Sequence, residues 1–373
     1  MKIGIITFHD SLNCGSMLQA YALQNTIFEK VGTNCEIIDY SSPEQQRIYG
    51  ALKKPRCLKD ILRNAFNILF LRQINKHIKD YREFSYQYLI KTKRKYDRLK
   101  DIQQNEELFD VLIAGSDQVW NVNAADCDST YFLPGIKCDK KIAYAVSLGA
   151  TDISCHKNAD TYSTYINDFD AISVREKNAQ RWVGKLYKRG EVDLTLDPTL
   201  LLNASQYSAI EGENIIKGEY IFWYTMVYKA DVKKIVLNIS KKLHIPVYVI
   251  DPKEWSRRGL FLNGIKLAPN GGPAAFLALV KNASLVLTSS FHGSIFSYLY
   301  EKDFWYINIH DGQAKDDRAQ CLLEQLGLEE RYVKMTEFAS LDIMRKIDYT
   351  KKKDISELRR YSIEFLYNSI DRL

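Results

Sequence analysis

The sequence has little of what marks secreted, membrane-spanning or disordered proteins. Its 7 cysteines are odd in number and form no C-x-x-C pair, whereas a disulfide framework is typical of much smaller secreted chains. The longest apolar runs, such as residues 68–71 and 143–146, are far shorter than the roughly 18 residues that a membrane span requires. Residues 1–8 lack the features of a signal peptide and predict a first strand. We therefore expect a cytoplasmic protein with reduced cysteines.

Motifs of several common enzyme classes are also missing. The sequence contains no H-E-x-x-H, G-x-S-x-G, P-loop or EF-hand pattern, which argues against a zinc hydrolase, a serine hydrolase, a P-loop kinase and a calcium site. Gly15 is not part of a G-x-G-x-x-G run, so a dinucleotide site is not predicted. Because no cluster of metal ligands is visible, we expect neither a metal nor a cofactor.

The length and composition are those of a folded protein with two domains. The 373 residues exceed what one hydrophobic core usually spans. Hydrophobic residues make up 46% and charged residues 26% of the chain, without the bias toward proline and glycine that disordered chains have.

The positive charge is concentrated in one segment. The chain has a formal charge of +6, but residues 47–100 contain 16 Lys or Arg and 4 Asp or Glu, a local balance of +12. Within them, residues 65–79 combine apolar groups with a cationic face at helical spacing, as an interfacial helix does. The segment is either a solvated helical excursion packed on its own domain or a contact for an anionic partner. An anionic membrane fits better than nucleic acid, because no nucleic-acid motif accompanies the charge.

Alternating apolar runs and amphipathic stretches predict an α/β protein with parallel sheets. The expected strands are residues 2–8, 36–39, 111–114, 142–146 and 171–174, then 220–224, 246–250, 285–288 and 305–309. The expected helices are residues 16–31 and 176–183, then 231–242, 273–281, 293–300, 316–326 and 354–370.

This order predicts two Rossmann-like domains that face each other across a cleft. The first, residues 1–205, carries a basic helical insertion at about 47–100. The second covers residues 206–353, and the linker between the two domains is placed within the polar stretch 205–218. A last helix in 354–373 is expected to cross back onto the first domain. Ligands are then expected at the carboxyl ends of both sheets.

Two loops of the first domain carry candidate sugar-binding residues. After the first strand, Asn13, Gly15 and Ser16 open a helix whose free N–H groups suit an anion or a hydroxyl. The alternative is that Asn13 and Ser16 only cap that helix.

After the strand at 111–114, Asp117 is followed by Gln118, Trp120 and Asn121. A carboxylate, two amides and an indole suit a polyol, and Asp117 is a candidate general base for a hydroxyl. The alternative is an aspartate that orders its own loop.

Arg175 and His292 are the candidates for binding and protonating an anionic donor. Arg175 stands where a strand gives way to a helix, and its guanidinium matches carboxylate and phosphate oxygens in pairs. The alternative is a structural ion pair with Glu176 or Asp197. His292 follows a strand and precedes a glycine at a helix start, so it suits a proton donor beside a phosphate cradle. The proposed cradle consists of Ser289, Ser290, Gly293 and Ser294. His9 and His310 stand at similar strand ends and are weaker candidates.

These loops, in this order, resemble the polysaccharide pyruvyl transferase family over roughly residues 1–310. The resemblance rests on residues 13–16, 115–121, 172–176, 196–200 and 289–294. It implies a glycosyltransferase-B-like fold and transfer of the enolpyruvyl group of phosphoenolpyruvate to a sugar, which forms a pyruvate ketal. Such enzymes are often encoded for the synthesis of bacterial capsule, exopolysaccharide or cell-wall glycans.

The same resemblance implies roles for individual residues. Arg175 and His292 match the donor-binding arginine and the histidine of the family's apolar-His-Gly motif. Many members have an arginine two positions before that histidine, where this chain has Ser290, so a second donor cation would come from elsewhere. Arg257, Arg258 and Lys266 are candidates. The first domain is then the acceptor side and the second the donor side, with phosphoenolpyruvate as co-substrate.

Two other functions remain open. A nucleotide-sugar-dependent glycosyltransferase would have the same two-domain shape but would need a pocket for a nucleobase and ribose. A non-catalytic scaffold in glycan assembly is favoured by Ser290 in place of arginine. For a pyruvyl transferase, the acceptor is a sugar in a polysaccharide or in its lipid-linked precursor.

Overall fold

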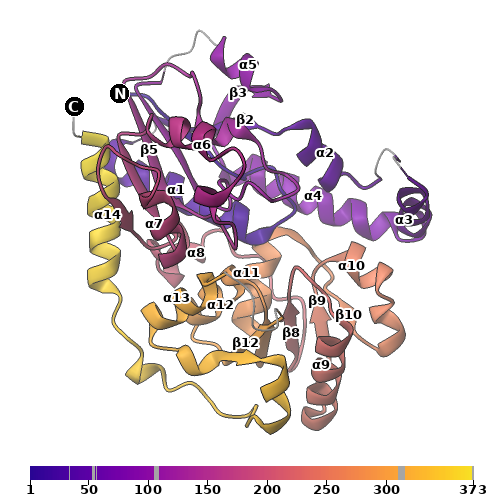
Figure 1. Cartoon of the computed structure of the whole chain (residues 1–373). Helices are drawn as coiled ribbons and strands as arrows, with labels where there is room; N and C mark the ends of the chain where they lie inside the picture. The colour runs from indigo at the N-terminus through magenta and orange to yellow at the C-terminus, as the bar shows by residue number, and fades with distance from the viewer. Residues whose placement is uncertain (33, 53–54, 56, 105–108, 310–315, 372–373) are drawn as a thin grey trace.

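The computed structural model describes every residue except 33, 53–54, 56, 105–108, 310–315 and 372–373. The described chain forms two parallel sheets, each covered by helices on both faces, one above the other in Figure 1. The predicted pair of Rossmann-like domains is therefore confirmed.

The first domain is built on a seven-stranded sheet with the order β3-β2-β1-β4-β5-β6-β7. All of its strand pairs are parallel. The central strands are almost wholly apolar and buried on both faces, as expected in a doubly wound sheet. Its strands are β1 (Ile3–Ile6), β2 (Cys35–Tyr40), β3 (Lys91–Tyr96), β4 (Val111–Asp117), β5 (Lys140–Val146), β6 (Ala171–Val174) and β7 (Val192–Leu194).

Helices of the first domain follow most of these strands. The longest is α1 (Cys14–Val31), which begins where Asn13 accepts hydrogen bonds from the N–H groups of Gly15 and Ser16. The others are α2 (Pro43–Tyr49), α5 (Leu99–Gln103), α6 (Ala159–Ile166), α7 (Lys177–Gly184) and α8 (Ala204–Tyr207), with a short 3-10 turn, η3 (Pro198–Leu200), before α8.

The second domain has a six-stranded parallel sheet with the order β10-β9-β8-β11-β12-β13. Its strands are β8 (Ile221–Tyr224), β9 (Val247–Val249), β10 (Lys266–Leu267), β11 (Leu285–Thr288), β12 (Phe304–Asn308) and β13 (Tyr332–Lys334). Its helices are α9 (Ala230–Leu243), α10 (Pro252–Arg257), α11 (Gly272–Asn282), α12 (Phe291–Leu299) and α13 (Arg318–Leu326).

The last helix, α14 (Ser356–Asp371), returns to the first domain. Tyr367 donates a hydrogen bond of 2.8 Å to the carbonyl of Thr26 in α1, and Ser362 accepts one from the backbone N–H of Leu196. The chain therefore crosses between the two domains twice, and α14 ties them together.

The basic segment differs in one respect from a purely helical insertion. It contains α3 (Leu58–Leu69) and α4 (Leu71–Tyr88), but it ends in β3, which pairs with β2 as the edge strand of the first sheet. The strand Lys91–Tyr96 is mostly charged, and only two of its six side chains are buried. An edge strand of this kind carries no apolar pattern, because charged residues protect an exposed edge. Within the described residues, no helix has both the length and the apolar character needed to cross a bilayer.

Candidate functional site

Loops from both domains meet at the carboxyl ends of the two sheets. Asp117 ends β4, Arg175 follows β6, and Asp197 follows β7 in the first sheet. His292 comes from the second domain, in the first turn of α12. In doubly wound proteins this end of the sheet is where ligands bind, so the topology brings the predicted donor and acceptor residues together.

Arg175 lies at the centre of this cluster and is buried. Its Nη1 donates to Asp197 Oδ2 at 2.5 Å, and its Nη2 donates to Asp117 Oδ1 at 3.2 Å. The guanidinium also lies over the ring of Phe291, 4.4 Å from its centroid. The ion pair with Asp197 is the structural alternative that the sequence left open. The Nε atom of Arg175 makes no hydrogen bond but lies 3.8 Å from Glu176 Oε2, which is the other ion pair that the sequence left open.

Asp117 is held in an unusual conformation at the end of β4. Its φ is 67°, in the left-handed region that few residues other than glycine adopt, and such strain tends to occur at functional sites. Ser16 Oγ donates to Asp117 Oδ2 at 2.5 Å. Burial raises the pKa of Asp117, but the nearby charges of Arg175 and His292 outweigh burial and lower it below the ordinary value. Asp117 is therefore ionised and accepts hydrogen bonds.

The carboxylate of Asp197 accepts hydrogen bonds from Arg175 and from Thr199 at the start of η3. Its Oδ1 accepts a hydrogen bond of 2.6 Å from the hydroxyl of Thr199, which fixes the loop after β7. Burial alone would raise the pKa of Asp197, but His292, Arg175 and Thr199 together lower it well below the ordinary range. The sequence motif contained this residue, but only the structure assigns it to the site.

His292 reaches the cluster from the second domain. Its Nε2 lies 3.6 Å from Asp197 Oδ2, beyond hydrogen-bond distance, and has no hydrogen-bond partner. On the other side, the ring touches Gly15, where a Cβ atom would lie 2.1 Å from Nδ1. The imidazole is thus enclosed between the two domains, with one ring nitrogen free for a ligand.

Two further charged groups lie near the cluster: Glu176, which the sequence offered only as an ion-pair partner, and Arg318, which sequence reasoning missed. Glu176 is fully buried, and burial raises its pKa from 4.5 to about 7 although Arg175 and Arg318 oppose this shift. Arg318 stands at the start of α13 and binds Asp316 through two nitrogens, at 2.8 and 2.5 Å. Glu176 stands in the 172–176 motif, where the sequence offered it only as a structural partner of Arg175. Arg318 belongs to no recognisable motif, because α13 approaches Glu176 only in the folded chain. His310 lies outside the described residues.

The predicted acceptor residues after β4 differ in their exposure to solvent. Trp120 is fully buried, its ring stacks on Phe132 with centroids 4.9 Å apart, and its Nε1 donates to the carbonyl of Tyr131. It therefore offers no aromatic face to a sugar, and this corrects its assignment as an acceptor-binding residue. Gln118 and Asn121 hydrogen-bond to each other at 2.8 Å, and both are partly exposed.

In the loop after β1, one predicted residue has a structural role and two lie in the site. Asn13 uses its side chain to cap α1, as the structural alternative had it, and Gly15 lies against His292. Ser16 does more than cap, because its hydroxyl binds Asp117.

The proposed phosphate cradle is partly occupied by hydrogen bonds of its own. Ser290 caps α12 by accepting from the N–H of Gly293 at 3.4 Å, and Ser294 donates to the carbonyl of Ser290. Ser289 lies 2.5 Å from the hydroxyl of Thr225. Gly293 packs against Thr288, whose Oγ1 would be 2.2 Å from a Cβ atom at that position. These residues shape the start of α12, and Ser289 and Ser290 remain partly exposed.

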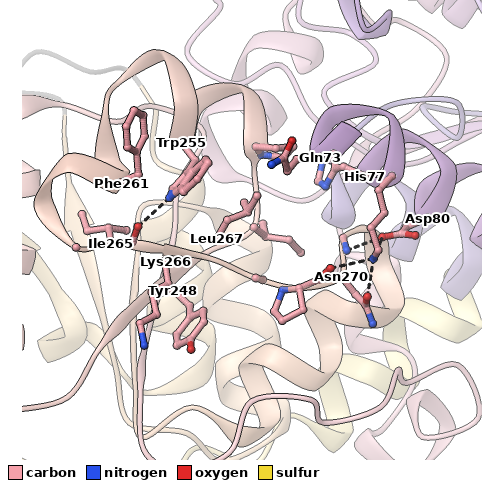
Figure 2. A pocket seen from close by; sticks show the side chains of 17 residues that line it. Gln73, His77, Asp80, Tyr248, Trp255, Phe261, Ile265, Lys266, Leu267 and Asn270 are labelled. Carbon is pink, nitrogen blue, oxygen red and sulfur yellow. Dashed lines mark hydrogen bonds and ion pairs between the residues drawn. The ribbon is translucent and has the colours of Figure 1, made fainter. Parts of the chain in front are cut away.

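The cations suggested as substitutes for a missing arginine lie elsewhere. Arg257 donates to Asn67 of α3 and to Glu254, and Arg258 also binds Glu254. Lys266 lines a pocket of about 680 Å³ between α4 and the second domain. Figure 2 shows Gln73, His77 and Asp80 on one side of this pocket and Tyr248 and Trp255 on the other. Arg318 acts electrostatically on Glu176 but, like Arg257 and Arg258, it is already paired, in its case with Asp316.

A smaller, more polar pocket lies at the carboxyl ends of β1 and β2. It has about 410 Å³ and is lined by residues that include His9, Ser11, Arg82 and Tyr86. His9 is held by Asp39, whose Oδ1 lies 3.1 Å from its Nε2. Tyr86, which lines this pocket, is 90% exposed, so its ring is open to a ligand. This pocket combines an aromatic ring with polar groups, as was expected of the loop that contains Trp120.

Comparison with known proteins agrees with these observations. A sequence model of the family described as polysaccharide pyruvyl transferase matches residues 13–311, which include all the residues of the cluster except Arg318. The chain belongs to the polysaccharide pyruvyl transferase family. No functionally curated protein matches it.

Solved structures with the same fold are enzymes that modify sugars. The UDP-GlcNAc 2-epimerase of Methanocaldococcus jannaschii has 12% identity and a TM-score of 0.54, and the match covers 98% of this chain and 100% of that one. The UDP-N-acetylglucosamine 2-epimerase of Rickettsia bellii has 10% identity and a TM-score of 0.51, over 100% and 97% of the chains. At this identity the likeness shows the fold alone, which is glycosyltransferase-B-like.

Proposed function

We propose that this member of the family transfers the enolpyruvyl group of phosphoenolpyruvate to hydroxyls of a sugar, with Arg175 and His292 at the reacting centre. The observation that carries the proposal is their convergence across the domain boundary. Arg175 Nε and His292 Nε2 are buried nitrogens without a hydrogen bond, and each lies beside a carboxylate, at 3.8 Å from Glu176 and 3.6 Å from Asp197 respectively. Such nitrogens suit a ligand with anionic oxygens, because an unsatisfied buried polar group is costly.

The chemistry requires one acid and at least one cation. Protonation of the methylene carbon by His292 makes the second carbon electrophilic, and Arg175 neutralises the carboxylate or phosphate of the donor. A sugar hydroxyl then attacks the second carbon, its proton is lost, and the carbon–oxygen bond to phosphate breaks. A second hydroxyl adds to the same carbon and closes the ketal. The products are the ketal and inorganic phosphate.

Asp117 acts on the acceptor side in this scheme. Because its pKa is lowered, it accepts a hydrogen bond from a sugar hydroxyl better than it removes a proton. Ser16, which donates to the same carboxylate, orients it. Of the two hydroxyl protons released, one restores the proton that His292 gave to the methylene carbon, and the other leaves on the inorganic phosphate.

We further propose that the acceptor enters through the polar pocket beside His9. Tyr86 provides an exposed ring on which a sugar can stack, and Arg82 and Lys91 line the same pocket. A sugar carried on a lipid precursor fits the biosynthesis of surface polysaccharides. The reaction would then take place at the inner face of the cytoplasmic membrane.

A nucleotide-sugar-dependent glycosyltransferase is the rival function, since the epimerase of Neisseria meningitidis, with a TM-score of 0.51 and 8% identity, was solved with bound UDP-GlcNAc. Thermal-shift measurements separate the two. We expect phosphoenolpyruvate to raise the melting temperature of the wild-type protein but not of Arg175→Lys. Stabilisation by UDP-sugars and not by phosphoenolpyruvate would contradict the proposal.

A further inference from the structure

Helix α3 turns its apolar side outward and its polar side inward. Leu58, Leu62 and Leu69 are 79%, 68% and 74% exposed, whereas Asn67 is 2% and Asp60 is 7% exposed. In an ordinary surface helix this pattern is reversed. Ile61, Phe66 and Ile68 are also more than half exposed. The exposed apolar surface, here called the α3 face, consists of Leu58, Ile61, Leu62, Phe66, Ile68 and Leu69.

Specific contacts fix this orientation. On the inner side, Asn67 accepts a hydrogen bond of 3.3 Å from Arg257 Nε and donates one of 2.9 Å to the carbonyl of Ala51. At the end of the helix, Phe70 packs edge-on against Trp255, with ring centroids 5.7 Å apart. Helix α3 is thus attached to α10 of the second domain by its polar side. It cannot rotate to bury the α3 face without losing these contacts.

The α3 face lies at the periphery of the molecule. Figure 1 shows α3 at the outer end of α4, away from both sheets. Six large apolar side chains on one 12-residue helix form a continuous patch, because residues three and four apart share a helix face. Contiguous apolar patches of this kind on a protein surface mark sites of contact with another molecule.

The charge around α3 selects the partner. Residues 47–100, which contain α3, carry a balance of +12, and Arg72 and Lys79 are exposed on the helix that follows. The part of this segment nearer to α3, residues 47–79, has 9 Lys or Arg and 1 Asp or Glu, so a second copy on the α3 face would bring like charges together, and these oppose a dimer. An anionic lipid surface offers an apolar interior to the leucines and negative headgroups to the cations.

We propose that α3 is an interfacial membrane helix. It lies in the plane of an anionic bilayer, with the α3 face at the boundary between headgroups and acyl chains and the basic residues of 47–100 near the headgroups. Both apolar burial and charge then contribute to binding. Salt weakens only the second contribution, so part of the binding remains at high ionic strength.

Vesicle co-sedimentation of the full chain tests this proposal. The probes are phosphatidylcholine vesicles with and without phosphatidylglycerol, at low and high salt. The test variant is Leu62→Glu/Phe66→Glu, which changes exposed side chains and should leave the melting temperature unchanged. The matched control is Ile215→Glu/Met344→Glu, at two exposed apolar residues of the second domain, 47% and 54% exposed, with the same change of charge.

The proposal expects wild type and control to bind vesicles that contain phosphatidylglycerol, with a fraction retained at high salt. The α3 variant should bind at least about tenfold more weakly, which corresponds to about 1.4 kcal/mol, since it removes one leucine and one phenylalanine from the apolar contact.

Three results would overturn the proposal that α3 binds membranes. These are no sedimentation of the wild type with vesicles, equal weakening of vesicle binding in the test variant and the control, or a wild-type dimer that the α3 variant converts to monomer. The assay contains neither phosphoenolpyruvate nor sugar, so its failure is distinct from failure of the proposed function.

Discussion

Gly15 of α1 lies directly against the imidazole of His292, so that a Cβ atom on residue 15 would be 2.1 Å from Nδ1. One residue belongs to the first domain and the other to the second. The absence of a side chain at position 15 therefore lets the two domains close around the Arg175 cluster.

Gly15→Ala should disrupt this closure. The added methyl group forces His292 or the domains apart, and overpacking of this kind costs about 1–3 kcal/mol of stability. Urea unfolding measures that cost. In a His292→Ala background the methyl group has room, so Gly15→Ala should cost much less there. An equal cost in both backgrounds would mean that residue 15 does not act through His292.

His292→Ala should reduce transfer about 10²-fold or more in kcat, which is the usual scale for loss of a general acid. The variant should remain folded, although its melting temperature should fall, because the buried imidazole lies against Gly15 and beside Asp197. Steady-state phosphate release measures the rate. Near-normal turnover would remove His292 from the mechanism.

Arg175→Lys should weaken donor binding, because an ammonium group cannot match the paired oxygens of a carboxylate or phosphate. The lysine still carries the positive charge that Asp117 and Asp197 require. The KM for phosphoenolpyruvate should therefore rise more than the KM for the sugar. If only the melting temperature fell and the donor KM stayed constant, Arg175 would have a structural role alone.

Glu176→Gln should change how stability depends on pH. Burial raises the pKa of Glu176 from 4.5 in the unfolded chain to about 7 in the folded protein. The folded state holds this proton over a range in which the unfolded chain releases it. The contribution of the protonated Glu176 carboxyl to the free energy of unfolding is therefore complete below about pH 4.5. It falls by up to about 3 kcal/mol as the pH rises toward about 7.

Glutamine stays neutral, so this loss should disappear in the variant. Melting temperatures of wild type and Glu176→Gln between about pH 5 and pH 8 measure the difference. The exposed Glu191 provides the control, Glu191→Gln. Parallel pH profiles for wild type and Glu176→Gln would contradict the raised pKa.

Tyr86→Ala should raise the KM for the sugar acceptor by about fivefold, since an aromatic contact is commonly worth about 1 kcal/mol. The KM for phosphoenolpyruvate and the melting temperature should stay constant, because the ring is almost wholly exposed. Tyr361→Ala, at an exposed tyrosine of α14, is the control. Unchanged acceptor kinetics would place the sugar outside this pocket.

The apolar strands and amphipathic helices were predictable because their patterns are local. The runs in β1, β4 and β11 and the periodicity of α1 and α9 appear directly in the sequence. Strand β3 was missed, because its pairing with β2 uses backbone groups and its side chains are charged. The basic segment was noted, but the outward direction of the α3 face depends on contacts with α10, which is far away in the chain.

The site was predictable only in part, for a similar reason. Arg175, Asp117 and His292 follow strands, and parallel strands end at a common edge. Whether Arg175 is paired depends on Asp197, which a different strand delivers. Trp120 and Tyr86 show the limit most clearly, because one aromatic ring is buried and the other is exposed. Nothing in the local sequence distinguishes the two.

The most direct test of the central claim is turnover of phosphoenolpyruvate. The wild-type protein and His292→Ala are incubated with phosphoenolpyruvate and a panel of p-nitrophenyl sugars and lipid-linked sugars, and phosphate release and ketal formation are followed together. The account predicts that at least one sugar supports phosphate release with a matching amount of pyruvate ketal, and that His292→Ala loses both. Consumption of a UDP-sugar in parallel reactions, with no turnover of phosphoenolpyruvate, would contradict it.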